Sequence, residues 1–146
     1  MRVIETESAE ETFGIAKEMG ERCAPGTVIG LVGDLGTGKT VFSKGFASGL
    51  GIRQNVSSPT YTIVQQYDDG KLPMFHFDVY RTADVSEMDE TGFDDCISGA
   101  GVTLVEWADM IEDIMPEKTV WITMEKNGEK GFDHRRITIE NEHTCY

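Results

Sequence analysis

Residues 33–40, Gly-Asp-Leu-Gly-Thr-Gly-Lys-Thr, constrain the fold of this chain more than any other segment. They match the pattern G-x-x-x-x-G-K-[ST], whose glycines let the backbone approach a ligand closely and whose N–H groups point at phosphate oxygens. The pattern supplies a lysine for the β- and γ-phosphates and a hydroxyl for Mg²⁺, here Lys39 and Thr40. A chance match in a chain of 146 residues has a probability of roughly one in a hundred or less, so the segment indicates a nucleotide-binding loop.

The flanking residues supply the strand and the helix that such a loop requires. Residues 28–32 form an apolar run typical of a buried parallel strand. After the loop, apolar residues recur at helical spacing to about residue 51, where glycines suit a helix end. The candidate nucleotide contacts of the loop are Gly33, Asp34, Leu35, Gly36, Thr37, Gly38, Lys39, Thr40 and Val41.

The rest of the chain predicts a three-layer α/β domain of the P-loop NTPase type over residues 1–146, with a mixed central sheet and antiparallel hairpin strands. Ser8 and Glu11 form a possible capping box before an apolar helical stripe that Pro25 and Gly26 end. Turn residues 68–71 separate two β-type runs. The remaining expected elements are a partly helical acidic stretch at 84–97, a strand at 102–105, a short helix at 108–115, and strands at 120–124 and 136–140.

Two of these strands carry candidate catalytic carboxylates. Glu106 ends the apolar run 102–105, as in a Walker B segment, and suits a Mg²⁺ ligand or a water-orienting group. In the run before it, His76, Asp78 and Tyr80 share one face. Taken alone, that face is more typical of a solvent face; beside a nucleotide and a metal, its histidine and aspartate would take part in catalysis or orient the groups that do.

Three other parts of the chain, a loop, a tryptophan and a pair of arginines, each allow two interpretations. The polar loop at 55–61 is either a plain connection or a segment that senses the γ-phosphate through Thr60. Trp107 is either core or an exposed indole over the nucleotide. Arg135 and Arg136 are preferred as surface cations on an edge strand, with a contact to phosphate or adenine as the alternative.

Net charge, cysteine content and the lack of long apolar runs indicate which partners and which cellular compartment to expect. The formal net charge of −13 argues against direct binding of nucleic acid, DNA included, so any action on nucleic acid should pass through a partner or through a local basic patch. Three widely spaced cysteines suit reduced thiols better than disulfides or zinc. With no apolar run of membrane-spanning length and no apolar leader after Met1, we expect a cytoplasmic protein that does not bind membranes.

Four segments, in this order, resemble the TsaE (YjeE) family of bacterial P-loop ATPases. They are the loop at 33–40, Ser-Pro-Thr-Tyr at 58–61, His-Phe-Asp-Val-Tyr-Arg at 76–81 and Leu-Val-Glu-Trp at 104–107. The third fits the family's H-x-D-x-Y-R pattern, which is far more specific than the loop itself. The similarity begins at the first expected helix and is looser beyond 107.

The resemblance implies a role in tRNA modification. The family takes part in making threonylcarbamoyladenosine beside the anticodon of tRNAs that read codons starting with A. It docks to the TsaB–TsaD pair, and its binding and hydrolysis of ATP reset that complex between turnovers. Another enzyme makes the threonylcarbamoyl adenylate. The implied ligands are therefore ATP and Mg²⁺, and no guanine-selective N/T-K-x-D motif argues otherwise.

The resemblance also implies residue roles. Lys39 matches the phosphate lysine, and Thr40 and Glu106 match the Mg²⁺ ligands. Thr60 resembles the switch threonine. Asp78 belongs to the family signature and is the candidate for ordering the attacking water or the surroundings of the metal.

Three further positions complete the candidate site. Trp107 lies at the site by the same resemblance. Thr37 stands where the family more often has alanine, a mild departure at a tolerant position. Because the match after Trp107 is looser, the adenine contacts, including any made by Arg135, stay open.

Two other functional classes remain as alternatives. One is a small-molecule kinase built on the same loop, although the chain is short for it and shows no obvious basic lid. The other is a non-hydrolytic module in which ATP only sets a conformation. Candidate carboxylates at Asp78 and Glu106 favour an ATPase, and one that is slow without its partners because no arginine finger is evident nearby except Arg81.

Overall fold

The computed structural model describes residues 1–34, 36–57, 64–80, 88 and 92–145. The helices are α1 (Ala9–Arg22), α2 (Lys39–Gly49), α4 (Phe93–Ser98) and the 3₁₀ helices η1 (Ala108–Ile114) and η2 (Glu142–Thr144). The strands are β1 (Arg2–Thr6), β2 (Val28–Val32), β3 (Val64–Tyr67), β4 (Met74–Asp78), β5 (Val102–Glu106), β6 (Val120–Lys126) and β7 (Arg135–Glu140).

In the described part of the chain, the strands form one mixed sheet in the order β1-β7-β6-β2-β5-β4-β3. The four middle strands, β6, β2, β5 and β4, are parallel, and β3, β7 and β1 pair antiparallel at the two sides. Strand β2 is buried along most of its length and β5 along all of it, which accounts for their continuous apolar runs. The mixed α/β sheet predicted from the sequence is therefore confirmed.

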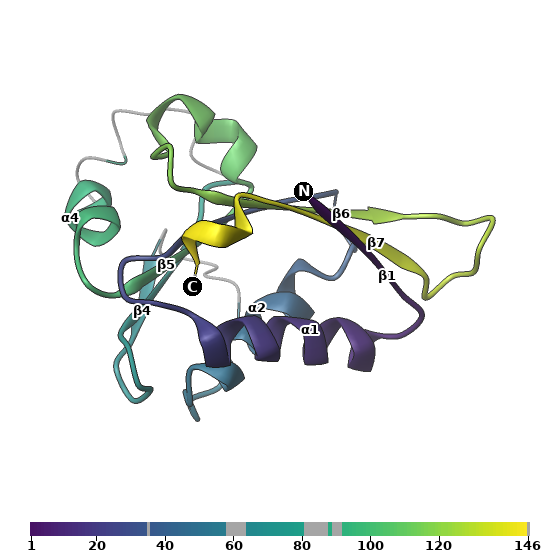
Figure 1. The fold of residues 1–146 in the computed structure, drawn as a ribbon, viewed down its shortest axis with the longest axis horizontal. Coiled ribbons are helices and arrows are strands. Elements are labelled where there is room, and N and C mark those ends of the chain that lie inside the picture. Colours follow the sequence, from purple (N-terminus) through teal and green to yellow (C-terminus); the bar gives the residue numbers. More distant parts are fainter. Residues whose placement is uncertain (35, 58–63, 81–87, 89–91, 146) are drawn as a thin grey trace.

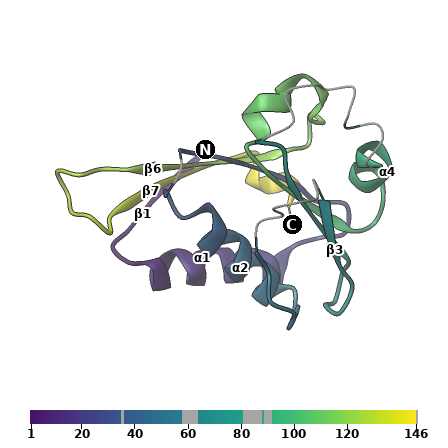
Figure 2. The same ribbon diagram turned by 180° about the vertical axis from the view of Figure 1, so that it is seen from behind.

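Helices cover both faces of this sheet. Helices α1 and α2 pack side by side on one face, and η1 and α4 lie on the other (Figure 1). Figure 2 shows the same three layers from behind. Each face has its own core: Phe42 and Phe46 of α2 belong to the first, and Phe77 of β4 and Phe93 of α4 to the second.

Helix α1 begins as the sequence predicts. The Ser8 hydroxyl accepts a hydrogen bond from the Glu11 N–H at 3.1 Å, and the Glu11 carboxylate accepts one from the Glu7 N–H rather than from that of Ser8. The apolar stripe predicted for this helix comprises Ala9, Phe13, Ala16, Met19 and Cys23. Ala16, Met19 and Cys23 lie in the core and Phe13 is partly buried, whereas Ala9, at the start of the helix, is exposed.

Strand β1 is not predicted by the sequence pattern, because Arg2 and Glu5 interrupt a short run with no clear alternation. Pairing with β7 and contacts at Glu5 hold it. Glu5 lies opposite Arg136 in the ladder, and its carboxylate is 3.1 Å from the buried His134 and 2.8 Å from Lys130. With β1 outside it, β7 is an interior strand, so the prediction that Arg135 and Arg136 lie on an edge strand is wrong, although Arg136 is exposed as a surface cation would be.

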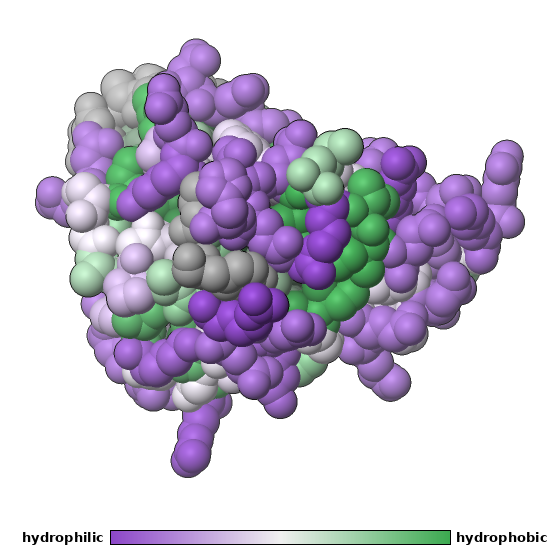
Figure 3. Space-filling view, viewed as in Figure 1, coloured by the Kyte–Doolittle hydropathy of each residue, from purple (hydrophilic) through white to green (hydrophobic). Residues whose placement is uncertain are grey.

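The short helix predicted at 108–115 is a 3₁₀ helix, Ala108–Ile114, with non-helical backbone at Ile111. Polar side chains cover most of the surface seen in Figure 3, as the acidic composition leads one to expect. Of the helices that the structure describes, none combines the length and the apolarity that a membrane crossing needs.

Candidate nucleotide-binding site

The glycine-rich loop joins β2 to α2, and its backbone is built for an anion. Gly38 is the N-cap of α2 with a φ of 100°, a left-handed conformation that favours glycine, and no side chain caps the helix. The N–H groups in the first turn of an α-helix have no acceptor on the preceding turn, so the start of α2 is suited to phosphate oxygens. At Gly33, a methyl group would lie 2.7 Å from the Met124 carbonyl oxygen, so only glycine fits there.

Lys39, the first residue of α2, lies inside this loop. The residue is 6% exposed, and its ammonium donates to the carbonyl of Gly33 and, at 3.0 Å, to that of Asp34. The same ammonium lies 3.8 Å from the ring centroid of Trp107. Burial lowers the pKa of Lys39, and nearby carboxylates, Glu106 foremost, oppose that shift. The cation is therefore held at the loop by carbonyl oxygens, an aromatic face and acidic neighbours.

Two carboxylates lie where parallel strands end beside the loop. Asp78 is the last residue of β4 and Glu106 the last of β5, and the two are direct neighbours in the ladder. Glu106 also lies opposite Leu31 of β2, two residues before Gly33. The structure thus brings the predicted Asp78, Glu106 and phosphate loop to one edge of the sheet, as expected for an α/β site.

The environments of the two carboxylates differ. Asp78 is half-buried, and its Oδ1 accepts a hydrogen bond from the Tyr80 N–H at 3.0 Å. Burial raises the pKa of Asp78, the Tyr80 bond opposes this, and the charge of Glu106 adds to the increase. Glu106 is 2% exposed and lies 2.5 Å from the imidazole of His76.

The solvent-face interpretation of residues 75–80 is wrong for His76. The alternation itself is confirmed, since Phe77 faces the η1–α4 core while Met74, on the side of His76, faces the α1–α2 core. Both faces of β4 are covered, however, so His76 is completely buried. A buried histidine without a hydrogen-bond partner costs free energy, and here Glu106 is the partner. The sequence alone does not reveal this contact.

Trp107 has a φ of 62°, an uncommon conformation for a residue other than glycine, directly after Glu106. Its indole is partly buried, lies against Tyr80 with ring centroids 4.6 Å apart, and supports the Lys39 ammonium. The left-handed turn lets the carboxylate and the indole both face the loop. Trp107 therefore belongs to the site as well as to the edge of the second core.

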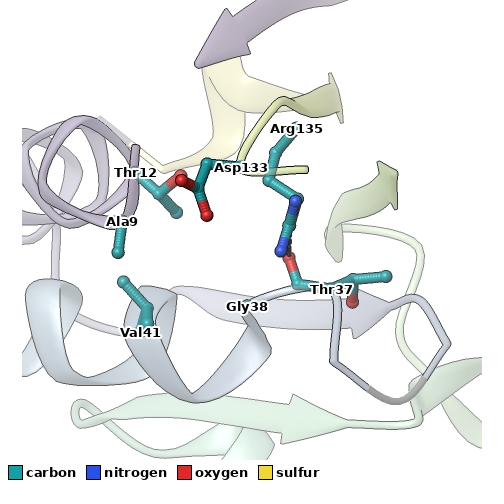
Figure 4. Close-up of a pocket in the computed structure, with 7 residues that line it drawn as sticks. All are labelled: Ala9, Thr12, Thr37, Gly38, Val41, Asp133 and Arg135. Carbon is teal, nitrogen blue, oxygen red and sulfur yellow. Dashed lines mark hydrogen bonds between the residues drawn. The ribbon is translucent and has the colours of Figure 1, made fainter. Parts of the chain in front are cut away.

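A pocket opens beside the loop, between α1, α2 and the β6–β7 connection (Figure 4). It spans about 320 Å³ when the adjoining open solvent is included, and is lined by Ala9, Thr12, Thr37, Gly38, Val41, Asp133 and Arg135. The Arg135 guanidinium donates to the carbonyls of Thr37 at 3.0 Å and Gly36 at 3.3 Å. These bonds place Arg135 beside the phosphate loop, while its contact with phosphate or adenine stays a prediction.

The loop closes on itself through Thr37. Its hydroxyl donates to the Asp34 carbonyl at 2.8 Å, and its side chain is buried.

Thr40 follows Lys39 in α2 and is exposed. The Thr40 hydroxyl and the Glu106 carboxylate are oxygen donors of the kind that Mg²⁺ takes together with phosphate oxygens, so these residues fit the metal that the sequence implies.

Some predicted residues fall outside the described part of the chain, and others were missed. Leu35 and Thr60 lie outside it, as does Arg81. Sequence reasoning did not select three residues that the structure brings to the site: Asp109 near the lysine, and Thr12 and Asp133 in the pocket. His76, for which the sequence left a solvent face and a role at the site open, lies against Glu106.

Comparison with known proteins agrees with this geometry. A family model described as "Threonylcarbamoyl adenosine biosynthesis protein TsaE" matches residues 6–137. The tRNA threonylcarbamoyladenosine biosynthesis protein TsaE of Bacillus subtilis (strain 168) is 49% identical over 134 residues, 92% of this chain and 82% of that protein. The protein of the same name from Treponema pallidum (strain Nichols) is 38% identical over 117 residues, 80% of this chain and 86% of that one.

A solved structure matches over nearly the whole chain. The crystal structure of Bacillus subtilis YdiB has a TM-score of 0.78 and 41% sequence identity, covering 94% of this chain and 83% of that one. The predicted P-loop NTPase-like fold and the sequence resemblance are both confirmed. The chain belongs to the TsaE family.

Proposed function

We propose that this chain is a Mg²⁺-dependent ATPase that serves threonylcarbamoyladenosine formation on tRNA. One observation carries the proposal: the uncapped start of α2, the buried Lys39 and the carboxylates of Asp78 and Glu106 converge at one edge of the sheet. Attack of water on a γ-phosphate is promoted by groups of these kinds, namely donors for the phosphate oxygens, a cation and a side chain that orients the water, here a carboxylate.

Lys39 and the loop amides would bind the phosphates. The ammonium of Lys39 donates to two loop carbonyls, and phosphate oxygens are stronger acceptors that would replace them. Burial lowers the pKa of Lys39, and a phosphate beside it would counter that shift because an opposite charge favours the charged form. The lysine would thus be fully cationic when ATP is bound.

Thr40 and Glu106 would hold the metal, which when bound neutralises charge on the phosphate oxygens. Asp78 would orient the attacking water, because its carboxylate is fixed by the Tyr80 N–H and lies beside Glu106. A raised pKa makes Asp78 a better proton acceptor than an ordinary aspartate. The assignment of Thr60 as the switch threonine stays a prediction.

The pocket beside the loop would take the adenosine end of the nucleotide. It adjoins Thr37 and Gly38, so a nucleotide whose phosphates bind the loop can extend into it. Ala9 and Val41 offer apolar contacts to a base, while Thr12 and Asp133 offer hydrogen-bonding groups (Figure 4). Arg135 lies between this pocket and the phosphate loop.

The partner would be a TsaB–TsaD pair, as the family resemblance implies, with tRNA reached only through it. The similar proteins from Bacillus subtilis and Treponema pallidum are named for threonylcarbamoyladenosine biosynthesis. A formal charge of −13 suits a subunit that leaves tRNA binding to others. ATP hydrolysis would then reset the pair between turnovers, in the cytoplasm.

Phosphate release from ATP, measured with and without a purified TsaB–TsaD pair, tests the proposal. We expect release to rise with the pair, to vanish in Lys39→Ala, and to stay at the wild-type level in Lys44→Ala. Lys44 is an exposed lysine of the same helix, so it controls for the loss of one charge from α2.

Each contrary outcome would contradict a different part of the proposal. Release that ignores the pair would contradict the partner role. A phosphorylated acceptor in place of free phosphate would indicate a kinase. ATP-dependent binding to the pair without any hydrolysis would indicate a passive nucleotide-gated module.

A further inference from the structure

His76 and Glu106 form a deeply buried polar contact at the site. His76 Nε2 lies 2.5 Å from Glu106 Oε2, and the two side chains are 0% and 3% exposed. A carboxylate can only accept, so the imidazole donates through Nε2–H. Glu106 is thereby held through one named oxygen from the neighbouring strand.

The contact follows from the strand register. His76 lies opposite Leu104, and Asp78 lies opposite Glu106, so all four side chains face the same side of the sheet. His76 lies two residues before Asp78, the last residue of β4, and its ring extends toward that strand end to contact the Glu106 carboxylate. Strand register, rather than loop conformation, therefore sets where this carboxylate can be.

A purely structural role accounts poorly for a histidine at this position. On its face of β4, His76 lies between Met74, which belongs to the apolar core, and the half-buried Asp78 at the strand end. Among the residues that the structure describes, His76 Nδ1 has no hydrogen-bond partner, so the ring brings a desolvation cost into the core. An apolar side chain would avoid that cost, whereas only a donor at the Nε2 position can bind Glu106.

We infer that His76 is a positioning residue that fixes the Glu106 carboxylate for the divalent cation of the nucleotide complex. This inference rests on the proposed function, in which Glu106 is a metal ligand. The physical reason is general: side chains that bind a metal-ligating group orient it and adjust its basicity, and their loss typically lowers metal affinity by about 10–100-fold.

Three variants separate positioning from structure. His76→Gln places an amide donor near the position of Nε2, whereas His76→Asn places its amide near Nδ1 and cannot reach Glu106. His76→Phe keeps a ring without a donor, and it serves if the buried asparagine amide impairs folding. The probe is Mn²⁺, titrated calorimetrically into each protein saturated with ADP, with urea unfolding of the apo proteins alongside.

We expect Mn²⁺ affinity to fall at least about tenfold in His76→Asn and His76→Phe and to stay within about threefold of wild type in His76→Gln. ADP affinity measured in EDTA should be the same in all four proteins, because the loop and Lys39 are untouched. Wild-type Mn²⁺ affinity in folded His76→Asn or His76→Phe would overturn the inference, as would a glutamine variant as weak as the asparagine one.

Glu106→Gln distinguishes failure of the inference from failure of the proposed function. If Glu106→Gln loses Mn²⁺ affinity while His76→Asn and His76→Phe do not, only the positioning role is wrong. If Glu106→Gln also binds Mn²⁺ like wild type, then Glu106 is not a metal ligand and the proposed assignment fails together with the inference.

Discussion

Replacing Gly45 by alanine tests how closely the helix that carries the phosphate lysine packs on its neighbour. A methyl group at Gly45 would lie 2.4 Å from the Phe13 carbonyl oxygen and 3.0 Å from Ala16 Cβ, both on α1. The nearest atom is backbone, so no side chain can rotate away. Helices α1 and α2 must separate by about 1 Å to restore a normal contact.

The separation has an estimable free-energy cost. In a helix interior, alanine is favoured over glycine by about 1 kcal/mol. Against this, overpacking costs about 1–3 kcal/mol, and moving α2 loosens Phe42 and Phe46 in the core beneath it, where lost packing costs a further few kcal/mol. We therefore expect Gly45→Ala to lower the free energy of unfolding by about 2–4 kcal/mol.

Gly14 provides the matched control within α1. A methyl group there would meet nothing within 4 Å, so Gly14→Ala should raise the free energy of unfolding by about 0.5–1 kcal/mol through helix propensity alone. Urea unfolding followed by circular dichroism measures both. With a slope of about 2 kcal/mol/M, the two midpoints should move in opposite directions, that of Gly45→Ala by about 1–2 M. Equal shifts for the two variants would refute the steric reasoning.

Three further changes test local contacts. Ser8→Ala removes the acceptor for the Glu11 N–H and should cost about 1 kcal/mol in urea unfolding, whereas Ser8→Asp should retain the cap. Burial raises the pKa of Asp78 above its ordinary 3.8, so wild-type stability should fall as pH rises from that value through the folded pKa. Asp78→Asn should lack this fall, and identical pH dependences of unfolding would contradict it. Arg135→Ala should weaken ADP binding about tenfold while Arg136→Ala, on the same strand, should not, as measured by calorimetry.

The middle of the sheet is readable from the sequence because its strands are short, apolar and followed by the residues of the site. The run ending at Val32 precedes the glycine-rich loop, and the run ending at Glu106 carries the carboxylate. These are local patterns, so the loop, Lys39 and Glu106 are identified without knowing which strands are neighbours. Strand β1 is different, because its pairing with β7 depends on residues more than a hundred positions away.

His76 shows what local sequence patterns cannot predict, namely whether a face of a strand is covered. Alternation assigns it correctly to the face of Asp78, but whether that face meets solvent depends on where α1 and α2 pack. A polar residue on a covered face must find a partner, and here the partner is on the next strand of the sheet. The sequence contains both residues, yet the contact exists only once β4 and β5 are parallel neighbours in a fixed register.

The same dependence on register explains why the site is built on strand ends rather than on loops alone. A shift of one residue between β4 and β5 would move His76 and Asp78 to the opposite face from Glu106, because side chains alternate along a strand. Such a shift would also expose the apolar side chains that now form the two cores, so the hydrophobic pattern enforces the alignment of the carboxylates. Strand register also positions Arg135. Its pairing with Lys126 at the start of the β6–β7 ladder brings its guanidinium to the loop carbonyls. The packing that stabilises the sheet is therefore also what places the charged groups around Lys39, and a substitution that loosens either core should disturb this site even when it touches none of its residues.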